Sequence, residues 1–220
     1  MIEPAFLSRY RTSVEAGPSD DTPLERVRFV VLDCETTGLD PSTDRIITIG
    51  AVGVVNAEIQ LADSFEALIK VEQNTSAVTV HGVTRDESLS GLEESDALVA
   101  LLDFLKDGVI VGHHIGHDIG ALNAGYERHW GLRLANRDVD TMDLTLHLER
   151  DGAFHGRPPI RHFTLDALCE MFSVVPYDRH TACGDAFITA QIFLRLLRLA
   201  SRHRQTLGRL AEVLDDPDGQ

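Results

Sequence analysis

The stretch VVLDCETTGLDP, residues 30–41, decides how the fold and the chemistry of this chain are interpreted. It begins as an apolar, β-branched run of strand length and ends in turn-forming residues. Asp33 and Glu35 follow the apolar run, and side chains two positions apart on a strand point to the same face. Adjacent carboxylates are unfavourable unless a cation or a proton lies between them. The segment indicates a metal site, although one acid starting the turn and the other facing solvent would also explain it.

The rest of the chain alternates between strand and helix signals. Apolar β-branched runs predict strands at residues 27–32, 45–55, 59–69, 109–112 and from Val139, with a hairpin turn at 56–58. Apolar residues at helical spacing predict helices at residues 95–106, 118–130, 164–172 and 185–201. A three-strand meander followed by alternating helices and strands predicts an α/β fold with a mixed sheet flanked by helices.

Length and composition favour one globular domain. A chain of 220 residues can bury a substantial core, and we expect residues 25–205 to form the domain. Residues 1–24 are expected to be an extension and linker, with Phe6, Leu7 and Tyr10 marking either a docking helix or a frayed end. Residues 206–220 are expected to be a tail whose acidic end is disordered.

Targeting and disulfide signals are weak. The first residues lack the basic and apolar pattern of a signal peptide, and no apolar run is long enough to span a membrane, which predicts a cytoplasmic location. Three cysteines, an odd number without close spacing, argue against a disulfide framework or a four-thiolate zinc site.

The net charge of −15 limits the kind of nucleic-acid contact that the chain can make. Long-range attraction to phosphates should be weak, which disfavours sliding along a duplex on a basic surface. Divalent cations would supply positive charge where the phosphate binds. The charge therefore favours a small substrate footprint on short or single strands without excluding nucleic acid.

A second cluster, VIVGHHIGHDIGAL at residues 109–122, places Asp118 near the start of a predicted helix. A carboxylate there can cap the helix or bind a metal. The histidines His113, His114 and His117 suggest a zinc site, and His117 followed by Asp118 suggests an HD-type phosphohydrolase. Both alternatives are disfavoured, because HD domains are all-helical and adjacent histidines on a strand diverge.

A third cluster, RHTACGDA at residues 179–186, places Asp185 at the start of the last long helix, five positions after His180. If Asp185 and Asp118 converge with the strand-end pair, the site contains four carboxylates and one imidazole. All-oxygen ligation suits magnesium or manganese and not zinc. A neutral imidazole beside such a site can accept a proton at neutral pH. Taken alone, His180 would be an ordinary loop histidine.

Together these segments resemble the DEDDh-type, or DnaQ-like, 3′→5′ exonucleases, a family that includes the proofreading ε subunit of bacterial DNA polymerase III. DCETTGLDP is similar to the first exonuclease motif, VHGVT (80–84) to the HGIT segment, and GHHIGHD to the segment that usually reads GHN followed by an aromatic-Asp pair. VDTMDL, HFTLDALCEMF and GDAFITAQIFLRLL are similar to the segments between and after them. The resemblance covers residues 27–197.

The resemblance implies a ribonuclease H-like fold with a five-stranded mixed sheet and a two-metal site. The implied ligands of two Mg²⁺ or Mn²⁺ ions are Asp33, Glu35, Asp118 and Asp185, with His180 as general base. The positions implied to contact the terminal nucleotide are Thr36, Thr37, Leu39 and His81. His114 and His117 replace the usual Asn and aromatic residue, which affects local packing and nucleotide contacts. Residues 205–207 do not form a convincing clamp-binding peptide.

The implied activity is a metal-dependent 3′→5′ exonuclease that releases nucleoside 5′-monophosphates from single-stranded nucleic acid. In such a site, two ions about 3.5–4 Å apart flank the phosphodiester. DNA is the favoured substrate, and an oligoribonuclease-like RNA exonuclease remains the alternative. A nucleic-acid-end binding module with weak catalysis is a further alternative. Action alone or with a polymerase or another replication or repair protein stays open.

Overall fold

The computed structural model describes residues 4–71, 90–154, 162–201 and 206–214. Its centre is one five-stranded mixed sheet with the strand order β3-β2-β1-β4-β5. The first three strands form an antiparallel meander, and β4 and β5 are parallel to β1. The strands are β1 (Phe29–Thr36), β2 (Ile46–Val55), β3 (Glu58–Leu68), β4 (Val109–Gly112) and β5 (Asp138–Asp140). This arrangement confirms the predicted α/β class and its mixed sheet.

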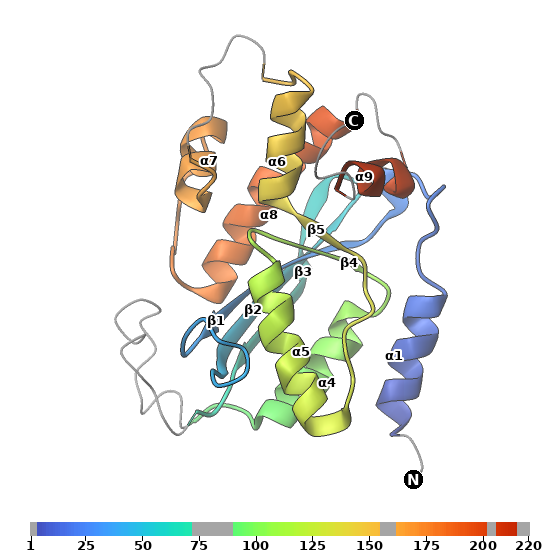
Figure 1. Ribbon diagram of the computed structural model, residues 1–220, viewed down its shortest axis with the longest axis vertical. Helices are drawn as coiled ribbons and strands as arrows, with labels where there is room; N and C mark the ends of the chain where they lie inside the picture. Colours follow the sequence, from blue (N-terminus) through green and yellow to red (C-terminus); the bar gives the residue numbers. More distant parts are fainter. Residues whose placement is uncertain (1–3, 72–89, 155–161, 202–205, 215–220) are drawn as a thin grey trace.

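Helices cover both faces of this sheet (Figure 1). On one side lie α1 (Ala5–Glu15), α4 (Glu94–Leu105) and α5 (Gly116–Trp130), and on the other α6 (Thr141–Arg150), α7 (Leu165–Phe172), α8 (Ala182–Ala200) and α9 (Leu207–Leu214). A short 3₁₀ helix, η1 (Leu24–Arg26), precedes β1.

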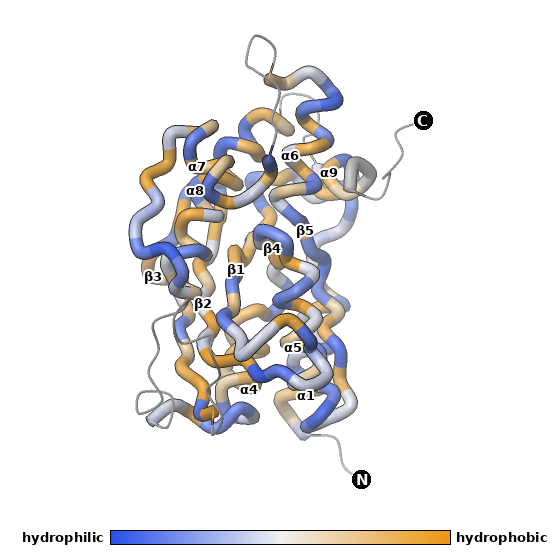
Figure 2. The backbone as a smooth tube through the Cα atoms, turned by 60° about the vertical axis from the view of Figure 1, so that its left-hand side comes forward, coloured by the Kyte–Doolittle hydropathy of each residue, from blue (hydrophilic) through white to orange (hydrophobic). Residues whose placement is uncertain are grey.

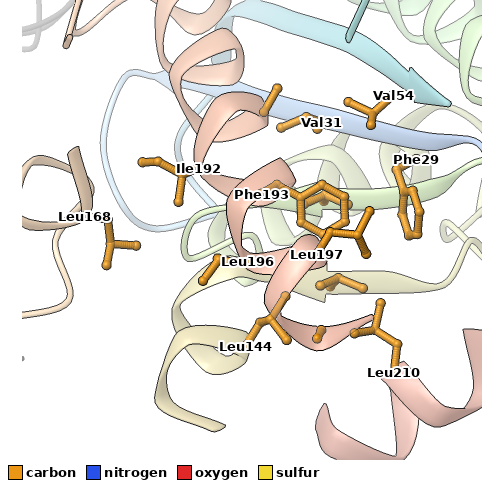
Figure 3. Close-up of a cluster of buried hydrophobic side chains, with 14 of the residues drawn as sticks. Phe29, Val31, Val54, Leu144, Leu168, Ile192, Phe193, Leu196, Leu197 and Leu210 are labelled. Carbon is orange, nitrogen blue, oxygen red and sulfur yellow. The ribbon is translucent and has the colours of Figure 1, made fainter. Parts of the chain in front are cut away.

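Alternation along β1 divides the core into two clusters. Phe29 and Val31 point toward α8, whereas Val30 and Leu32 point toward α4 and α5. On the α8 side, the rings of Phe29 and Phe193 pack edge to face with their centroids 4.9 Å apart, within the cluster drawn in Figure 3. Figure 2 shows the consequence for composition, since the tube of β2 is mainly hydrophobic and that of the edge strand β3 is mixed. Strand β1 is therefore packed on both of its faces.

The N-terminal helix α1 packs against α4. Leu7 and Tyr10 are buried, and the Tyr10 hydroxyl donates a 2.6 Å hydrogen bond to Asn136 Oδ1. Docking, which was one of the two interpretations of this segment, is therefore what the structure shows for residues 5–15.

Several boundaries differ from those predicted. Strand β1 continues through Asp33 and Glu35 to Thr36, because its pairing with β2 persists beyond the apolar run. Helix α6 was not predicted; its N-cap is Asp140, whose side chain accepts a hydrogen bond from the Met142 amide. The sequence VHGVT, His81 included, lies outside the described residues. Within the described residues, no helix is long and apolar enough to cross a membrane.

Candidate active site

The site begins with two acids on the face of β1 that looks toward α8. Asp33 and Glu35 continue the odd-numbered series of Phe29 and Val31, so alternation directs their side chains to that face. The register with β2 shifts between Glu35 and Thr36, which ends the regular ladder where the acids lie. The predicted shared face of the two carboxylates is thus an outcome of strand geometry.

Gly50 on β2 allows the third acid to approach. It pairs with Asp33 across the ladder, and a Cβ built on Gly50 would lie 2.4 Å from the Ala182 carbonyl carbon and the Cys183 nitrogen. The start of α8 therefore packs directly on the strand backbone. Thr181 caps this helix by accepting a 3.0 Å hydrogen bond from the Gly184 amide. Asp185 falls in the first turn, beside Asp33.

Three carboxylates meet at this point. One oxygen each of Asp33, Glu35 and Asp185 lies within 4.8 Å of the other two. Burial, reinforced by Asp118 and the other acids, raises the pKa of Asp33 well above its usual range. Burial, followed by the charge of Asp185, raises the pKa of Glu35 to about 7. Keeping these carboxyls ionised together is therefore costly, and a bound divalent cation would relieve that cost.

Asp118 reaches the same region from the opposite side of the sheet. Strand β4 pairs with β1 only at residues 29–31, so the edge of β1 beyond Val31 lacks a neighbouring strand there. The Cys34 amide donates instead to Asp118 Oδ1, at 2.7 Å. Burial raises the pKa of Asp118 to about 7, and the hydrogen bond from Cys34 opposes this rise. The structure thus brings all four predicted acids to one end of β1.

An arginine, Arg179, contacts the acid cluster. Arg179 Nη1 donates to Asp185 Oδ2, and its Nε donates to Asp166 Oδ1 at 2.8 Å. Asp185 Oδ1 is buried and receives no hydrogen bond from any residue that the structure describes. A buried, unpaired carboxylate oxygen beside two more carboxylates fits a hard divalent cation.

His180 lies next to Arg179 and is exposed. Its amide donates to Asp185 Oδ2 at 3.3 Å, and its φ of 64° is in the left-handed region. The turn that carries His180 packs tightly against the start of α8. A Cβ on Gly184 would lie 1.9 Å from the Asp178 carbonyl oxygen. His180 is therefore held beside Asp185 through its backbone, while its side chain is accessible to solvent.

A pocket of about 410 Å³ opens beside the acids. Its lining residues come from β1, the following loop, the turn after β4 and the first half of α5: Asp33, Cys34, Glu35, Thr36, Gly38, Leu39, Pro41, Asp44, His113, His114, His117, Asp118 and Ala121. The lining thus includes three of the predicted acids and three histidines.

The four positions implied to contact nucleotide have different placements. Thr36 and Leu39 line the pocket, and the Leu39 side chain is highly exposed, at 83%. The Thr37 hydroxyl donates to Asp44 Oδ1 at 2.9 Å, and Thr37 is not among the lining residues that the structure describes. His81 lies outside the described residues.

The pocket histidines do not assemble a zinc site with the acids. In the described part of the chain, the closely spaced ligand group consists of Asp33, Glu35 and Asp185 alone. His113 Nδ1 is hydrogen-bonded to Thr141 Oγ1 at 2.9 Å, and burial lowers the His113 pKa to about 4. The central sheet excludes an all-helical HD domain.

Two residues that support the site, Arg179 and Asp140, were not predicted from the sequence. Arg179 stands beside His180 in the quoted RHTACGDA segment, so adjacency was a signal, but its two acidic partners come from different helices. Asp140 accepts hydrogen bonds from the amides of His114 and Ile115 at 3.1 and 3.0 Å, which holds the turn before α5. No local pattern distinguishes Asp140 from an ordinary helix cap.

Comparison with known proteins connects this geometry to nucleases. The family model RNase_T, described as exonuclease, matches residues 30–193. The PolC-type DNA polymerase III of Thermotoga maritima is 34% identical over 190 residues, which cover 84% of this chain and 13% of that polymerase. The PolC-type enzyme of Bacillus subtilis is 30% identical over 181 residues, covering 81% of this chain and 12% of its own length. The chain thus spans about an eighth of these relatives.

Solved structures show the same fold. Exonuclease I of E. coli in complex with a dT13 oligonucleotide superimposes with a TM-score of 0.66 at 18% identity, over 82% of this chain and 42% of that one. Its zinc-bound complex with single-stranded DNA gives a TM-score of 0.67 at 18% identity, over 85% and 42% of the two chains. At this identity the likeness concerns the fold alone.

Proposed function

The chain belongs to the RNase_T exonuclease family, and from this premise we propose that it removes nucleotides from the 3′ end of single-stranded nucleic acid, preferably DNA. The DnaQ-like resemblance and the ribonuclease H-like fold expected from the sequence are confirmed by the family match and the structural neighbours. The proposed products are nucleoside 5′-monophosphates. We propose residues 25–205 as the exonuclease domain, which encloses the matched range 30–193.

The observation that carries this proposal is the close approach of Asp33, Glu35 and Asp185, one of which, Asp185, has a buried oxygen without a hydrogen-bond partner among the described residues. Together with Asp118, these residues would hold two divalent ions, Mg²⁺ or Mn²⁺, because their donor set is all oxygen. When bound, such ions supply positive charge to the scissile phosphodiester and make a water molecule more acidic. The protein's own contribution is to hold four carboxylates in place before substrate arrives.

His180 is the proposed general base. Its backbone is tied to Asp185 and its side chain is exposed, so the imidazole can accept a proton from the attacking water at the edge of the acid cluster. A neutral imidazole nitrogen carries a lone pair that can accept this proton.

The pocket supplies the proposed contacts with the terminal nucleotide. Thr36 and Leu39 line it beside the acids, and the exposed Leu39 side chain offers an apolar surface to a base or sugar. Thr37 would act through the backbone and shape of the loop that carries Leu39, because its hydroxyl is engaged with Asp44. We retain His81 as a proposed contact from the family resemblance.

Substrate class follows from charge and from the relatives. The net charge of −15 favours a short, single-stranded footprint over a long duplex. The PolC-type relatives are DNA polymerases, and the structural neighbours include complexes with DNA oligonucleotides. We therefore propose single-stranded DNA as the preferred substrate, presented by a polymerase or another replication or repair protein.

Digestion of matched DNA and RNA oligomers tests this function. Strands labelled at the 5′ end should give a ladder of progressively shorter labelled products with Mg²⁺ or Mn²⁺, and no products with EDTA. Immediate release of the label as a mononucleotide would establish the opposite polarity, and faster RNA cleavage would favour the oligoribonuclease-like alternative. Binding of 3′ ends without cleavage in any metal would replace the enzyme with an end-binding module.

A further inference from the structure

Arg179 lies at the junction between the acid cluster and the rest of the fold. Its guanidinium forms ion pairs with Asp185 on α8 and Asp166 on α7. The Arg179 and Asp185 side chains are 20% and 8% exposed, whereas that of Asp166 is 64% exposed. The planar guanidinium of Arg179 thus links the buried carboxylate of Asp185 to the exposed carboxylate of Asp166.

The two oxygens of Asp185 have different surroundings. Oδ2 accepts hydrogen bonds from the Arg179 guanidinium and the His180 amide. Oδ1 is buried without a partner among the described residues. A carboxylate held by two donors through one oxygen cannot rotate freely, so the remaining oxygen keeps a fixed direction.

The charge of Arg179 need not oppose a cation in the site. Asp166 pairs with the guanidinium at 2.8 Å and offsets its charge, so the pair as a whole is close to neutral. Its net effect on a neighbouring cation is then small compared with that of four carboxylates. The main effect of Arg179 is therefore to hold the Asp185 carboxylate in one orientation.

We infer that Arg179 is a positioning residue that clamps Asp185 Oδ2, so that Oδ1 alone is presented to a divalent ion, with Asp166 as the anchor of the clamp. This inference rests on the proposed function. Hydrogen-bond partners of metal ligands typically change metal affinity or activity by about 10–100-fold when removed. Arg179 has this relationship to Asp185 without itself being able to bind a cation.

The same clamp fixes the turn that carries His180. Asp178 and His180 both have left-handed φ values, of 59° and 64°, and such conformations persist only when surrounding contacts maintain them. Arg179 lies between these two residues and is joined to two helices. Releasing the guanidinium should loosen the His180 backbone as well as Asp185.

Titration of the protein with Mn²⁺ alone, followed by calorimetry, tests the inference without substrate. We expect Arg179→Gln to weaken Mn²⁺ binding by about 10–100-fold, and Asp166→Asn to weaken it by a smaller factor. Arg179→Lys should recover part of the Mn²⁺ affinity, because an ammonium can pair with Asp185 but cannot bind Asp185 and Asp166 together as the planar guanidinium does. The double variant should be no weaker than Arg179→Gln, since both changes release one clamp.

Arg133→Gln is the matched control, because it also removes one guanidinium paired with an acid, Glu127, beyond the far end of α5. Circular dichroism and thermal unfolding in EDTA would establish that each variant is folded; Asp166→Asn changes an exposed residue and serves if Arg179→Gln does not fold. Unchanged or tighter Mn²⁺ binding in folded Arg179→Gln would overturn the clamp. Absence of Mn²⁺ binding by the unaltered protein would overturn the proposed function itself.

Discussion

The amide of Cys34 donates a 2.7 Å hydrogen bond to Asp118 Oδ1, and this contact joins the strand that carries Asp33 and Glu35 to the helix that carries Asp118. It lies where β1 extends beyond its pairing with β4. One carboxylate oxygen of Asp118 therefore satisfies a strand amide that β4 does not pair.

Two substitutions separate these roles of Asp118. Asp118→Asn keeps an Oδ1 acceptor for the Cys34 amide but removes the negative charge. We expect at least a 10²-fold loss of activity, by analogy with the loss of about 10²–10³ when one electrostatic donor is removed. In EDTA, Asp118→Asn should have a higher Tm than the unaltered protein, because it removes a buried charge. Asp118→Ala also leaves the half-buried Cys34 amide without this hydrogen bond, at a cost of up to about 1–3 kcal/mol. Paired activity and thermal unfolding assays check this. Equal Tm values for the two variants would contradict the structural role of the hydrogen bond.

Gly50→Ala should disrupt the site from the side of β2. Its Cβ would meet the Ala182 and Cys183 backbone at 2.4 Å, so α8 must shift and Asp185 with it. Overpacking of this kind typically destabilises by about 1–3 kcal/mol, and activity should fall further than stability explains. Gly116→Ala is the control, because no atom lies within 4 Å of its Cβ. Wild-type activity in Gly50→Ala would show that the close approach is not needed.

His180→Ala should lower kcat by about 10²–10⁴ without loss of fold, the usual range for a positioned base. Single-turnover measurements with excess enzyme would isolate the chemical step. His129→Ala is the control and should keep the full rate. His129 pairs with Glu94 at the C-terminal end of α5, whereas Asp118 lies in the first turn of that helix. Turnover of His180→Ala near that of His129→Ala would remove His180 from the mechanism.

Leu39→Ala should weaken binding of the 3′ end by about tenfold, or ~1.4 kcal/mol, while leaving the Tm unchanged. The side chain is 83% exposed and lines the pocket, so it stabilises a ligand more than the fold. Fluorescence anisotropy with a labelled oligonucleotide measures the effect. Leu61→Ala, an equally truncated exposed leucine on β3, should bind normally. The same affinity in both variants would argue against a nucleotide contact at Leu39.

The stability of the metal-free protein should fall as the pH rises from about 4 to about 7. Burial raises the folded-state pKa values of Glu35 and Asp118 to about 7, above the ordinary value of about 4. The folded protein therefore holds protons that the unfolded chain has released, and this stabilisation is lost as the pH passes through about 7. Thermal unfolding in EDTA at several pH values measures the trend.

Saturating Mn²⁺ should reverse that trend by stabilising the ionised cluster. Glu35→Gln removes one titrating group and should flatten the pH dependence in EDTA. A Tm that is independent of pH in the unaltered protein, or an equal slope in Glu35→Gln, would contradict the assignment of these raised pKa values to folding.

Much of the fold could be predicted because its signals are local. The β-branched run before Asp33 and the apolar spacing of residues 185–201 report strand and helix directly. Helix α6 escaped because its cap, Asp140, follows a strand of only three residues, Asp138–Asp140. The site acids could be proposed through their order along the chain, but Arg179 could not, because its partners Asp166 and Asp185 become neighbours only after α7 and α8 pack.

The sequence by itself determined that Asp33 and Glu35 share a face, since alternation on a strand requires no knowledge of the rest of the molecule. Only the tertiary structure decided which groups meet that face. The contact of α8 with Gly50 brings Asp185 to Asp33, and the unpaired edge of β1 brings Asp118 to Cys34. The raised pKa of Glu35 also belongs to the tertiary structure, because burial and neighbouring charge arise from packing between elements distant in the sequence.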